Sequence, residues 1–252
     1  MYIVIPMAGA SSRFYNAGYT KPKYMLPLGN ETVFDKSVRS FEKYFNNAFF
    51  IFVIRADDID AYEFVQDHAN ALKIKMFTII VLKSITRGQA ETVYEALVKM
   101  NIDTTSDDIL VIFNIDTIRY NLKIPVGNYS SYFDAFYDPN PDESKWSFCK
   151  VDDSETWLIE TAEKKKISNW CSTGLYIFGS VRSFARTYRE LFLQGILAKT
   201  KFYIAPMYNY IIPNNSKSSN YLLKCLREDV EFSGVPDEYE TLKIKYSTKE
   251  RD

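Results

Sequence analysis

Four short runs of apolar residues, rich in β-branched and aromatic side chains, alternate with longer segments whose apolar residues recur at helical spacing. The short runs are Tyr2–Ile5, Phe49–Ile54, Phe77–Leu82 and Ile109–Phe113, and the segments with helical spacing are Val33–Tyr44, Ile59–Leu72 and Ala90–Met100. Strands and helices in alternation form βαβ units, which make the strands parallel and place helices on both faces of the sheet. We therefore predict an α/β fold with a mostly parallel, Rossmann-like central sheet, whose ligands bind beyond the carboxyl ends of the strands.

The pattern changes in the second half of the chain. Shorter strands are predicted at Trp146–Lys150, Thr156–Ile159 and Gly174–Phe178, followed by an amphipathic helix near Val181–Gln194. With 252 residues, 46% of them hydrophobic, the chain can bury one continuous core. We expect a single domain over residues 1–252, in which residues 131–252 form a smaller subregion beside residues 1–130.

The charge balance excludes several classes of partner. The 31 Lys and Arg residues nearly match the 32 Asp and Glu residues, which leaves a net charge of −1. This balance indicates neither a nucleic-acid-binding surface nor an anchor for an anionic membrane. No segment approaches the ~18 consecutive apolar residues that a membrane span requires, and no basic stretch precedes an apolar one at the N-terminus. We expect a soluble, cytoplasmic protein with no nucleic-acid or membrane partner.

The cysteines and the histidine exclude several chemistries. Cys149, Cys171 and Cys225 are widely spaced and contain no CxxC pair, which argues against a disulfide framework and against a zinc site. His68 is the single histidine, and its helical context predicts a surface position on a helix. Ser-His-Asp, Cys-His and multi-histidine metal sites are therefore not expected.

The loop after the first predicted strand has the composition of an anion site. Ala8, Gly9, Ala10, Ser11 and Ser12 lack bulk, so the backbone can approach an anion and offer N–H donors to it. The two cations that follow, Arg13 and Lys23, can neutralise phosphate oxygens. Together they indicate a site for a nucleoside triphosphate.

These residues, in the motifs MAGASSRF and GYTKPK, resemble the signature of the nucleotidylyltransferases that activate sugar phosphates, especially the capsule-biosynthesis members. The resemblance implies that the Ala8–Ser12 backbone wraps the base and phosphates. It also implies that Arg13 holds the leaving pyrophosphate and that Lys23 contacts the α-phosphate. Ser11 stands where the family favours glycine, and a serine there can still offer its N–H if φ stays negative.

Two further segments of the first half fit the same family. In Thr86–Thr92, the resemblance places Arg87, Gly88 and Gln89 at the nucleotide, with Gly88 and Gln89 at the base; the plain alternative is a helix start capped by Thr86. Asn114 and Asp116 follow the fourth strand and resemble the acidic segment of the family. The resemblance implies that Asn114 contacts the nucleotide and that Asp116 binds Mg²⁺, an ion that prefers carboxylate oxygens.

The second half carries the acceptor motifs. A Glu163-Lys164 pair before the strand Ser172–Phe178 resembles the pattern in which the lysine binds the acceptor phosphate, so Lys164 is our candidate, although it belongs to a run of three lysines that can be a solvated face. The segment Lys201–Asn209 resembles the helix that borders the acceptor pocket, and most of its aromatic residues are expected to pack. The second metal-binding aspartate of many relatives is not evident, and Glu231 is the nearest substitute.

The resemblance implies in-line attack of an acceptor phosphate oxygen on the α-phosphorus of a nucleoside triphosphate, with release of pyrophosphate and without a general base. Alignment and charge neutralisation by Arg13, Lys23, Lys164 and Mg²⁺ would supply the catalysis. Within the family the chain most resembles the cytidylyltransferases of capsule clusters. CTP is therefore the favoured nucleotide, and L-glutamine phosphate or a sugar 1-phosphate the acceptor.

Two other functions stay open at this stage. The Asn114–Asp116 segment can be read as a degenerate D-x-D motif of a GT-A-type glycosyltransferase, which would start from a nucleotide sugar and would not need Arg13 and Lys23 on a triphosphate. A nucleotide-sensing protein without catalysis is the alternative that is not an enzyme. The sequence also leaves a homo-oligomer open.

Overall fold

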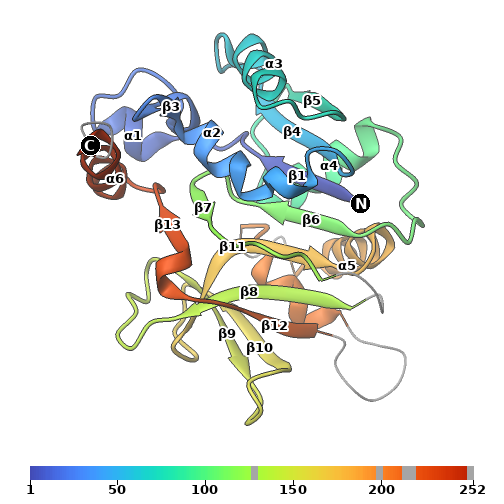
Figure 1. Cartoon of the computed structure of the whole chain (residues 1–252). Coiled ribbons are helices and arrows are strands. Elements are labelled where there is room, and N and C mark those ends of the chain that lie inside the picture. The colour runs from blue at the N-terminus through green and yellow to red at the C-terminus, as the bar shows by residue number, and fades with distance from the viewer. Residues whose placement is uncertain (126–129, 197–200, 212–219, 249–252) are drawn as a thin grey trace. The chain divides into compact units, whose positions relative to one another are not determined.

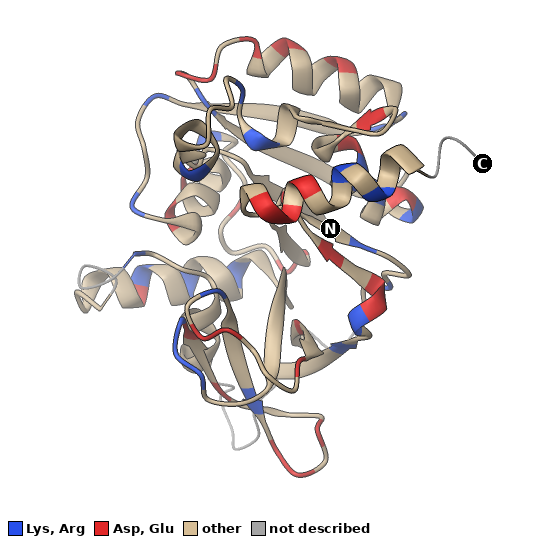
Figure 2. Ribbon diagram, turned by 90° about the vertical axis from the view of Figure 1, so that its left-hand side faces the viewer, with Lys and Arg blue, Asp and Glu red and all other residues tan. Residues whose placement is uncertain are grey.

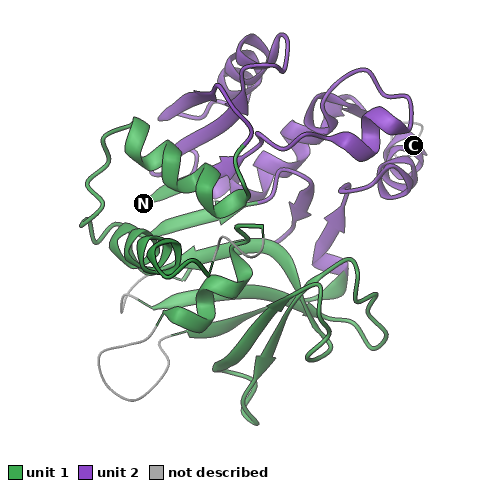
Figure 3. Ribbon diagram, turned by 180° about the vertical axis from the view of Figure 1, so that it is seen from behind, with its two compact units in different colours: residues 1–4, 86–113, 123–227 green, residues 5–85, 114–122, 228–252 purple. Residues whose placement is uncertain are grey.

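The computed structural model describes residues 1–125, 130–196, 201–211 and 220–248. The chain divides into two compact units, each built from three segments, as Figure 3 shows. Unit 1 contains residues 1–4, 86–113 and 123–227, and unit 2 contains residues 5–85, 114–122 and 228–252. The units therefore interleave along the sequence, and the first strand begins in unit 1 and ends in unit 2.

Unit 1 is built on a mixed sheet (Figure 1). Its strands are β1 (Tyr2–Pro6, of which the first residues belong here), β6 (Leu110–Phe113), β8 (Ser131–Tyr137), β9 (Ser147–Val151), β10 (Leu158–Glu163), β11 (Trp170–Phe178) and β12 (Asn220–Cys225). β1 and β6 run parallel, with Ile3 opposite Val111, and their adjoining residues are fully buried. β11 lies antiparallel to β6, β8 and β9, while β12 lies parallel to β8.

Helices α4 (Gln89–Lys99) and α5 (Val181–Leu193) and the 3-10 helix η4 (Ala205–Tyr210) complete unit 1. The Ser180 hydroxyl caps α5 by accepting a hydrogen bond of 3.0 Å from the Ser183 N–H. Phe184 of α5 meets Phe178 of β11 edge to face, with ring centroids 5.1 Å apart. The apolar stripe of α5 therefore packs on the sheet, as its helical spacing predicts.

Unit 2 holds the parallel pair β4 (Phe49–Arg55) and β5 (Phe77–Leu82). The Met7 N–H, directly after β1, donates to the Val53 carbonyl over 2.8 Å. The other elements of unit 2 are α1 (Ser12–Asn16), η1 (Lys23–Met25), β2 (Pro27–Leu28), β3 (Glu31–Thr32), α2 (Val33–Val38), η2 (Arg39–Tyr44), α3 (Ala61–Ala71), β7 (Thr117–Arg119), β13 (Val230–Phe232) and α6 (Pro236–Thr248). Thr32 and Asp35 form a reciprocal capping box that starts α2.

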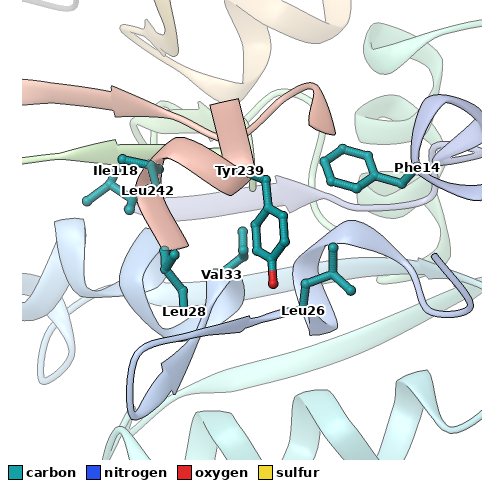
Figure 4. Packing of buried hydrophobic residues seen from close by; sticks show 7 residues of the cluster. All are labelled: Phe14, Leu26, Leu28, Val33, Ile118, Tyr239 and Leu242. Carbon is teal, nitrogen blue, oxygen red and sulfur yellow. The ribbon is translucent and has the colours of Figure 1, made fainter. Parts of the chain in front are cut away.

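The C-terminal helix α6 shares an apolar cluster with the N-terminal part of unit 2, as Figure 4 shows. Tyr239 lies 1% exposed among Phe14, Leu26, Leu28, Val33, Ile118 and Leu242. Its hydroxyl donates to the Pro27 carbonyl over 2.7 Å, so this buried polar group is satisfied. About 1.5–3 kcal/mol accompanies full burial of one large apolar side chain, so this cluster fixes α6 against the segment that follows Lys23.

The α/β fold predicted from the sequence is confirmed, and the four strands of the first half lie within a residue or two of their predicted bounds. The segment predicted as one helix over Val33–Tyr44 is instead the α-helix α2 followed by the 3-10 helix η2, and η2 is kinked at Phe41, which has the non-helical angles φ −107° and ψ 17°. The strand predicted at Thr156–Ile159 runs further, as β10, to Glu163. His68 lies on α3, but it is not a plain surface residue: its ring packs on Phe64 and its Nδ1 lies 2.8 Å from an Asp35 carboxylate oxygen.

All three cysteines are free and buried in unit 1. Burial raises the pKa of the Cys171 thiol to about 12, and burial likewise raises the pKa of Cys149. Since the thiolate is the reactive form, we expect a thiol reagent at pH 8 to label the folded protein at least about 100-fold more slowly than the protein in denaturant, where three thiols per chain should react. Rapid labelling of even one thiol in the folded state would contradict this burial.

Figure 2 shows basic and acidic residues interspersed along the chain. Among the described residues, no helix combines the length and the apolar character that crossing a bilayer takes.

Candidate active site

The loop after β1 is positioned by the sheet and open to solvent. Met7 and Ala8 are buried, whereas Gly9, Ala10 and Arg13 are exposed. Ser11 precedes α1 with φ 48° and ψ 24°, which is the left-handed conformation. The condition stated above for Ser11, a negative φ, is therefore not met. The serine adopts the conformation that glycine takes without steric cost, which explains physically why the family favours glycine there.

Lys23 and Asp116 form an ion pair within unit 2. The Lys23 ammonium donates a short hydrogen bond to the Asp116 carboxylate, and the two side chains are 24% and 20% exposed. Lys23 opens η1 directly after Pro22, and Asp116 follows β6 by three residues. The structure thus brings together a cation and a carboxylate that lie 93 positions apart, and solvent still reaches both.

The turn before α6 fixes the Asp116 backbone. Both the N–H and the hydroxyl of Ser233 donate to the Asp116 carbonyl, over 2.8 and 3.2 Å. β13 and β7 pair antiparallel beside this contact, with Phe232 opposite Thr117. A Cβ at Gly234 would lie 3.1 Å from an Asp116 carboxylate oxygen, so the missing side chain makes room for the carboxylate.

Glu238 is a second carboxylate next to this turn. It accepts hydrogen bonds from the Gly234 and Val235 N–H groups, over 2.8 and 3.3 Å, at the start of α6. The same oxygen lies 3.5 Å from the position of a Cβ on Gly234, so carboxylate oxygens of Asp116 and Glu238 both lie next to this glycine. Glu238 was not predicted from the sequence, although it lies two residues after the Gly234–Pro236 turn.

Glu231 lies on β13 opposite Ile118. Its carboxylate binds Tyr120, Tyr246 and Lys245. Tyr120 and Tyr246 each donate a hydrogen bond of 2.8 Å to it, and Lys245 forms an ion pair with it. Burial alone would raise the pKa of Glu231, but hydrogen bonds from Lys245, Tyr246 and Tyr120 outweigh it, so the pKa is lowered. Its role as the second metal ligand stays a prediction. In the structure it ties α6 to β7 and β13.

The fit of the site to Mg²⁺ can be judged from the carboxylates present. Among residues 1–125, 130–196, 201–211 and 220–248, no group of three or more His, Cys, Asp or Glu side chains could hold a metal ion. Mg²⁺ at phosphate sites commonly takes one or two carboxylates and completes its shell with waters and phosphate oxygens. Asp116, with the Glu238 carboxylate also next to the Cβ position of Gly234, meets that smaller requirement.

The predicted base-binding segment lies in unit 1 before α4. Burial alone would raise the pKa of Glu91, but hydrogen bonds from the Arg87 side chain and N–H outweigh it and lower the pKa. The Arg87 guanidinium also lies over the Phe202 ring, 4.3 Å from its centroid. Arg87 is thus held by a carboxylate and an aromatic ring, while half of its side chain stays exposed.

The packing around Gly88 explains why a glycine stands at this position, and this was not predicted from the sequence. A Cβ at Gly88 would lie 2.6 Å from the backbone N and O atoms of Phe202, which is closer than atoms can approach. The Phe202 N–H donates to the Arg87 carbonyl over 3.3 Å, and the Ala90 N–H donates to the Phe202 carbonyl over 2.8 Å. Thr86 does not cap α4; the N-cap is Gly88, and the Thr86 hydroxyl instead donates to the Gly88 carbonyl over 3.3 Å.

Lys164 lies exposed at the end of β10 in unit 1 with φ 52°, a left-handed conformation that is uncommon for lysine. Its N–H donates to the Trp146 carbonyl over 3.0 Å. Burial raises the pKa of the neighbouring Glu163, against a hydrogen bond from Ser147 and the charge of Lys164. The turn therefore sends Lys164 into solvent beside a half-buried carboxylate.

The Lys201–Asn209 segment ties β10 in place. The Asn209 side-chain amide donates to the Thr161 carbonyl over 2.8 Å and accepts from the Thr161 N–H over 2.7 Å, so it pairs with β10 as a neighbouring strand would. The Tyr208 hydroxyl donates to the Tyr132 and Ile177 carbonyls and is buried. The expectation that the aromatic residues of this segment mostly pack agrees with Phe202 and Tyr208, both nearly fully buried.

Solved structures identify the relatives of this chain. A nucleoside-diphosphate-sugar pyrophosphorylase from Vibrio cholerae RC9 is 40% identical over 96% of this chain and 99% of its own, with a TM-score of 0.86. The chain belongs to the nucleoside-diphosphate-sugar pyrophosphorylase family. A scan of protein-family models and a search of curated proteins found no match.

Solved structures of much lower identity share the fold of this chain. A putative glucose-1-phosphate thymidylyltransferase from Bacillus anthracis is 16% identical, with a TM-score of 0.73 over 98% of this chain and 96% of its own. The inositol-1-phosphate CTP transferase from T. maritima is 12% identical, with a TM-score of 0.72 over 97% of this chain and 95% of its own. At these identities the likeness shows the pyrophosphorylase fold and nothing further.

In this pyrophosphorylase-family chain, the predicted site residues fall into two groups. Unit 2 holds Ala8 to Arg13, Lys23, Asn114, Asp116 and Glu231, and unit 1 holds Arg87, Gly88, Gln89 and Lys164. Within unit 2 the structure joins Lys23 directly to Asp116, and it gives Glu231 separate partners. Sequence reasoning missed Glu238, as well as Arg55 and Asp58 at the carboxyl end of β4. The acidic cluster Asp57-Asp58-Ile59-Asp60 after a buried strand was an available signal for the last two.

Proposed function

We propose that the protein is a Mg²⁺-dependent nucleotidylyltransferase that joins a nucleoside triphosphate, preferably CTP, to a phosphorylated small acceptor and releases pyrophosphate. The observation that carries this proposal is the partly buried Lys23–Asp116 pair, together with an exposed small-residue loop: the loop follows β1 and Asp116 follows β6, its parallel neighbour. A cation next to a carboxylate provides, on one surface, a charge for phosphate oxygens and a ligand for the metal that accompanies them. Membership of the pyrophosphorylase family supports the same chemistry.

In the proposed reaction, an oxygen of the acceptor phosphate attacks the α-phosphorus of the nucleotide. A new P–O bond forms on one side while the bond to the β-phosphate bridging oxygen breaks on the other, and its electron pair leaves with pyrophosphate. The attacking oxygen is already ionised near neutral pH, so no side chain has to accept a proton, in agreement with a site that contains no histidine among its candidate residues. In-line attack with spread negative charge depends on alignment and charge.

The side chains have separate tasks in this proposal. Lys23 neutralises and orients the α-phosphate, Arg13 binds the departing pyrophosphate, and Lys164 binds the acceptor phosphate. The backbone from Ala8 to Ser12, together with Asn114 and the Arg87–Gln89 segment, binds the nucleotide. Mg²⁺ held by Asp116 would offset charge on the triphosphate oxygens. Glu231 is the proposed second ligand, whereas Glu238 is a carboxylate that lies with Asp116 next to Gly234.

The favoured substrates are CTP and L-glutamine phosphate, with a sugar 1-phosphate as the alternative acceptor, in bacterial capsular polysaccharide biosynthesis. The motifs shared with the capsule-cluster cytidylyltransferases support this choice. The chain would act in the cytoplasm, where CTP is made.

The test is a pyrophosphate-release screen of four nucleoside triphosphates against sugar 1-phosphates and L-glutamine phosphate. We expect turnover with Mg²⁺, highest for CTP with L-glutamine phosphate, and loss of turnover when EDTA removes the metal. A screen without turnover for any pair would overturn the enzyme proposal. Consumption of a UDP-sugar without pyrophosphate release would favour a glycosyltransferase instead, and nucleotide binding without turnover would favour a sensing protein.

A further inference from the structure

A buried polar network includes Tyr24, the residue after Lys23, and none of the predicted site residues belongs to it. The Arg55 guanidinium donates to one Asp58 carboxylate oxygen over 3.1 Å, and the Tyr24 hydroxyl donates to the other over 3.3 Å. Tyr24 is 1% exposed, and the side chains of Asp58 and Arg55 are 3% and 11% exposed. All three residues belong to unit 2.

The sheet fixes the position of Asp58. Arg55 is the last residue of β4, and the Asp58 N–H donates to the Arg55 carbonyl over 3.2 Å in the turn that follows. The Asp58 carbonyl in turn accepts from the Ala61 N–H, over 3.2 Å, at the start of α3. The carboxylate therefore projects from a turn that is held by a strand on one side and a helix on the other.

A tyrosine at position 24, in place of a phenylalanine, adds an unfavourable contribution to the free energy of folding, and packing alone does not explain why it is there. A buried hydroxyl and a buried carboxylate both lose hydration, and each must find a partner to avoid a penalty. An apolar core at this place would fold without that penalty. Tyr24 already packs its ring on Phe64, with centroids 6.1 Å apart, so the hydroxyl adds direction to a contact that the ring supplies.

Tyr24 is the neighbour of Lys23 in η1, a single turn of 3-10 helix closed by the Met25 N–H to the Pro22 carbonyl over 2.9 Å. Successive side chains of a 3-10 helix point about 120° apart. With Tyr24 held at Asp58, the turn directs Lys23 to another side, where its ammonium meets Asp116. A rotation of η1 that broke the Tyr24–Asp58 contact would carry the Lys23 ammonium with it.

We propose that Tyr24 and Asp58 are positioning residues for Lys23: the hydrogen bond between them sets the angle of η1 and thereby aims the ammonium at the α-phosphate. This inference rests on the proposed function, in which Lys23 binds that phosphate. Arg55 completes the network by compensating the buried charge of Asp58.

The chain offers a matched control. Tyr19 lies four residues before η1, and its hydroxyl donates to the Glu240 carboxylate of α6 over 2.5 Å. Tyr24→Phe and Tyr19→Phe each remove one hydroxyl and one hydrogen bond to a carboxylate. If the Tyr24 hydroxyl served folding alone, the two variants should behave alike once the activity is expressed per folded molecule.

The experiment measures kcat, the KM of each substrate and the Kd of the nucleotide for both variants, with the folded fraction determined in parallel. We expect Tyr24→Phe to lower kcat about tenfold and to weaken nucleotide binding several-fold, with the acceptor KM unchanged, because the phosphate contact is misaligned. Asp58→Asn, which keeps an acceptor for the hydroxyl, should lose less than Tyr24→Phe. Tyr19→Phe should stay within twofold of the unsubstituted protein.

A double-mutant cycle on nucleotide Kd separates positioning from stability. If Tyr24 acts through Lys23, then Tyr24→Phe changes Kd several-fold when Lys23 is present and less than twofold in a Lys23→Met background. Equal factors in both backgrounds would overturn the inference and leave the proposed function intact. A protein without any pyrophosphate release would overturn the proposed function and this inference with it.

Discussion

Replacing Lys23 by methionine is expected to lower the rate of pyrophosphate release by about 10²–10³-fold, which is the usual loss when one preorganised charge at a reacting phosphate or oxyanion is removed. Methionine keeps an unbranched, flexible side chain of similar length, so the change removes charge with little change of volume. Because the Lys23 ammonium meets Asp116, the substitution also leaves that carboxylate without its counter-ion in the nucleotide-free protein.

A structural role for the same ion pair predicts a different result. The pair is partly exposed, and ion pairs open to solvent contribute about 0–1 kcal/mol to stability. The free energy of unfolding of Lys23→Met should therefore fall by no more than about 1 kcal/mol, while the rate falls by orders of magnitude. A large loss of stability with an unchanged rate per folded molecule would assign Lys23 to folding and remove it from the reaction.

Lys21→Met is the control for this substitution. Lys21 precedes the same Pro22 and is exposed, so its replacement removes an equal charge from the same loop without touching Asp116. We expect its kcat within twofold of the unsubstituted protein. A similar loss in both variants would mean that the net charge of the loop, and not the position of Lys23, decides the rate.

The elements that were predicted well from the sequence are those whose residue types alone indicate whether they are buried or exposed. The runs that became β1, β4 and β6 are almost entirely apolar, and the structure buries nearly all of their side chains. Such residues have one stable place in a folded chain, the core of a sheet covered on both faces. The helices between them were predicted from the helical spacing of their apolar residues alone.

Helix α6 and strands β8 and β12 were not predicted, because their signals depend on distant partners. α6 has little apolar asymmetry of its own, and its anchor, Tyr239, is buried only because Phe14 and Leu28 face it from the other end of the chain. β8 contains Asp134, a buried carboxylate that accepts a hydrogen bond of 2.6 Å from the Thr173 hydroxyl. A lone aspartate argues against a buried strand until its partner is known.

The same distinction between local signals and distant partners holds for the candidate site. Lys23 and Asp116 were both selected from motifs, but their contact could not be derived from a separation of 93 positions. Arg55 and Asp58 were missed because a cluster of acidic residues after a strand usually marks a solvated turn, and only the position of the Tyr24 hydroxyl reveals the network.

Gly88 is the second position at which a substitution should have a large effect, here on stability. Gly88→Ala is expected to lower the free energy of unfolding by about 2–3 kcal/mol, as overpacking a well-filled core does. The new Cβ would lie 2.6 Å from backbone atoms of Phe202, and a backbone cannot move aside as the end of a flexible side chain can. Since Gly88 has an extended φ of 167°, backbone strain is not the cause, and the clash alone sets the cost. Denaturant titration measures it.

Gly9→Ala is the matched substitution in the loop after β1. A Cβ at Gly9 would meet nothing within 4 Å, and Gly9 is not among the glycines with a positive φ. The same added methyl should therefore leave stability unchanged or raise it by about 0.4–1 kcal/mol through the unfolded state. Equal effects at both positions would contradict the close approach of Phe202. A loss confined to Gly88 would show that this glycine is needed where two backbones meet, so any contact of the segment with a base must come from the side of Gly88 that faces away from Phe202.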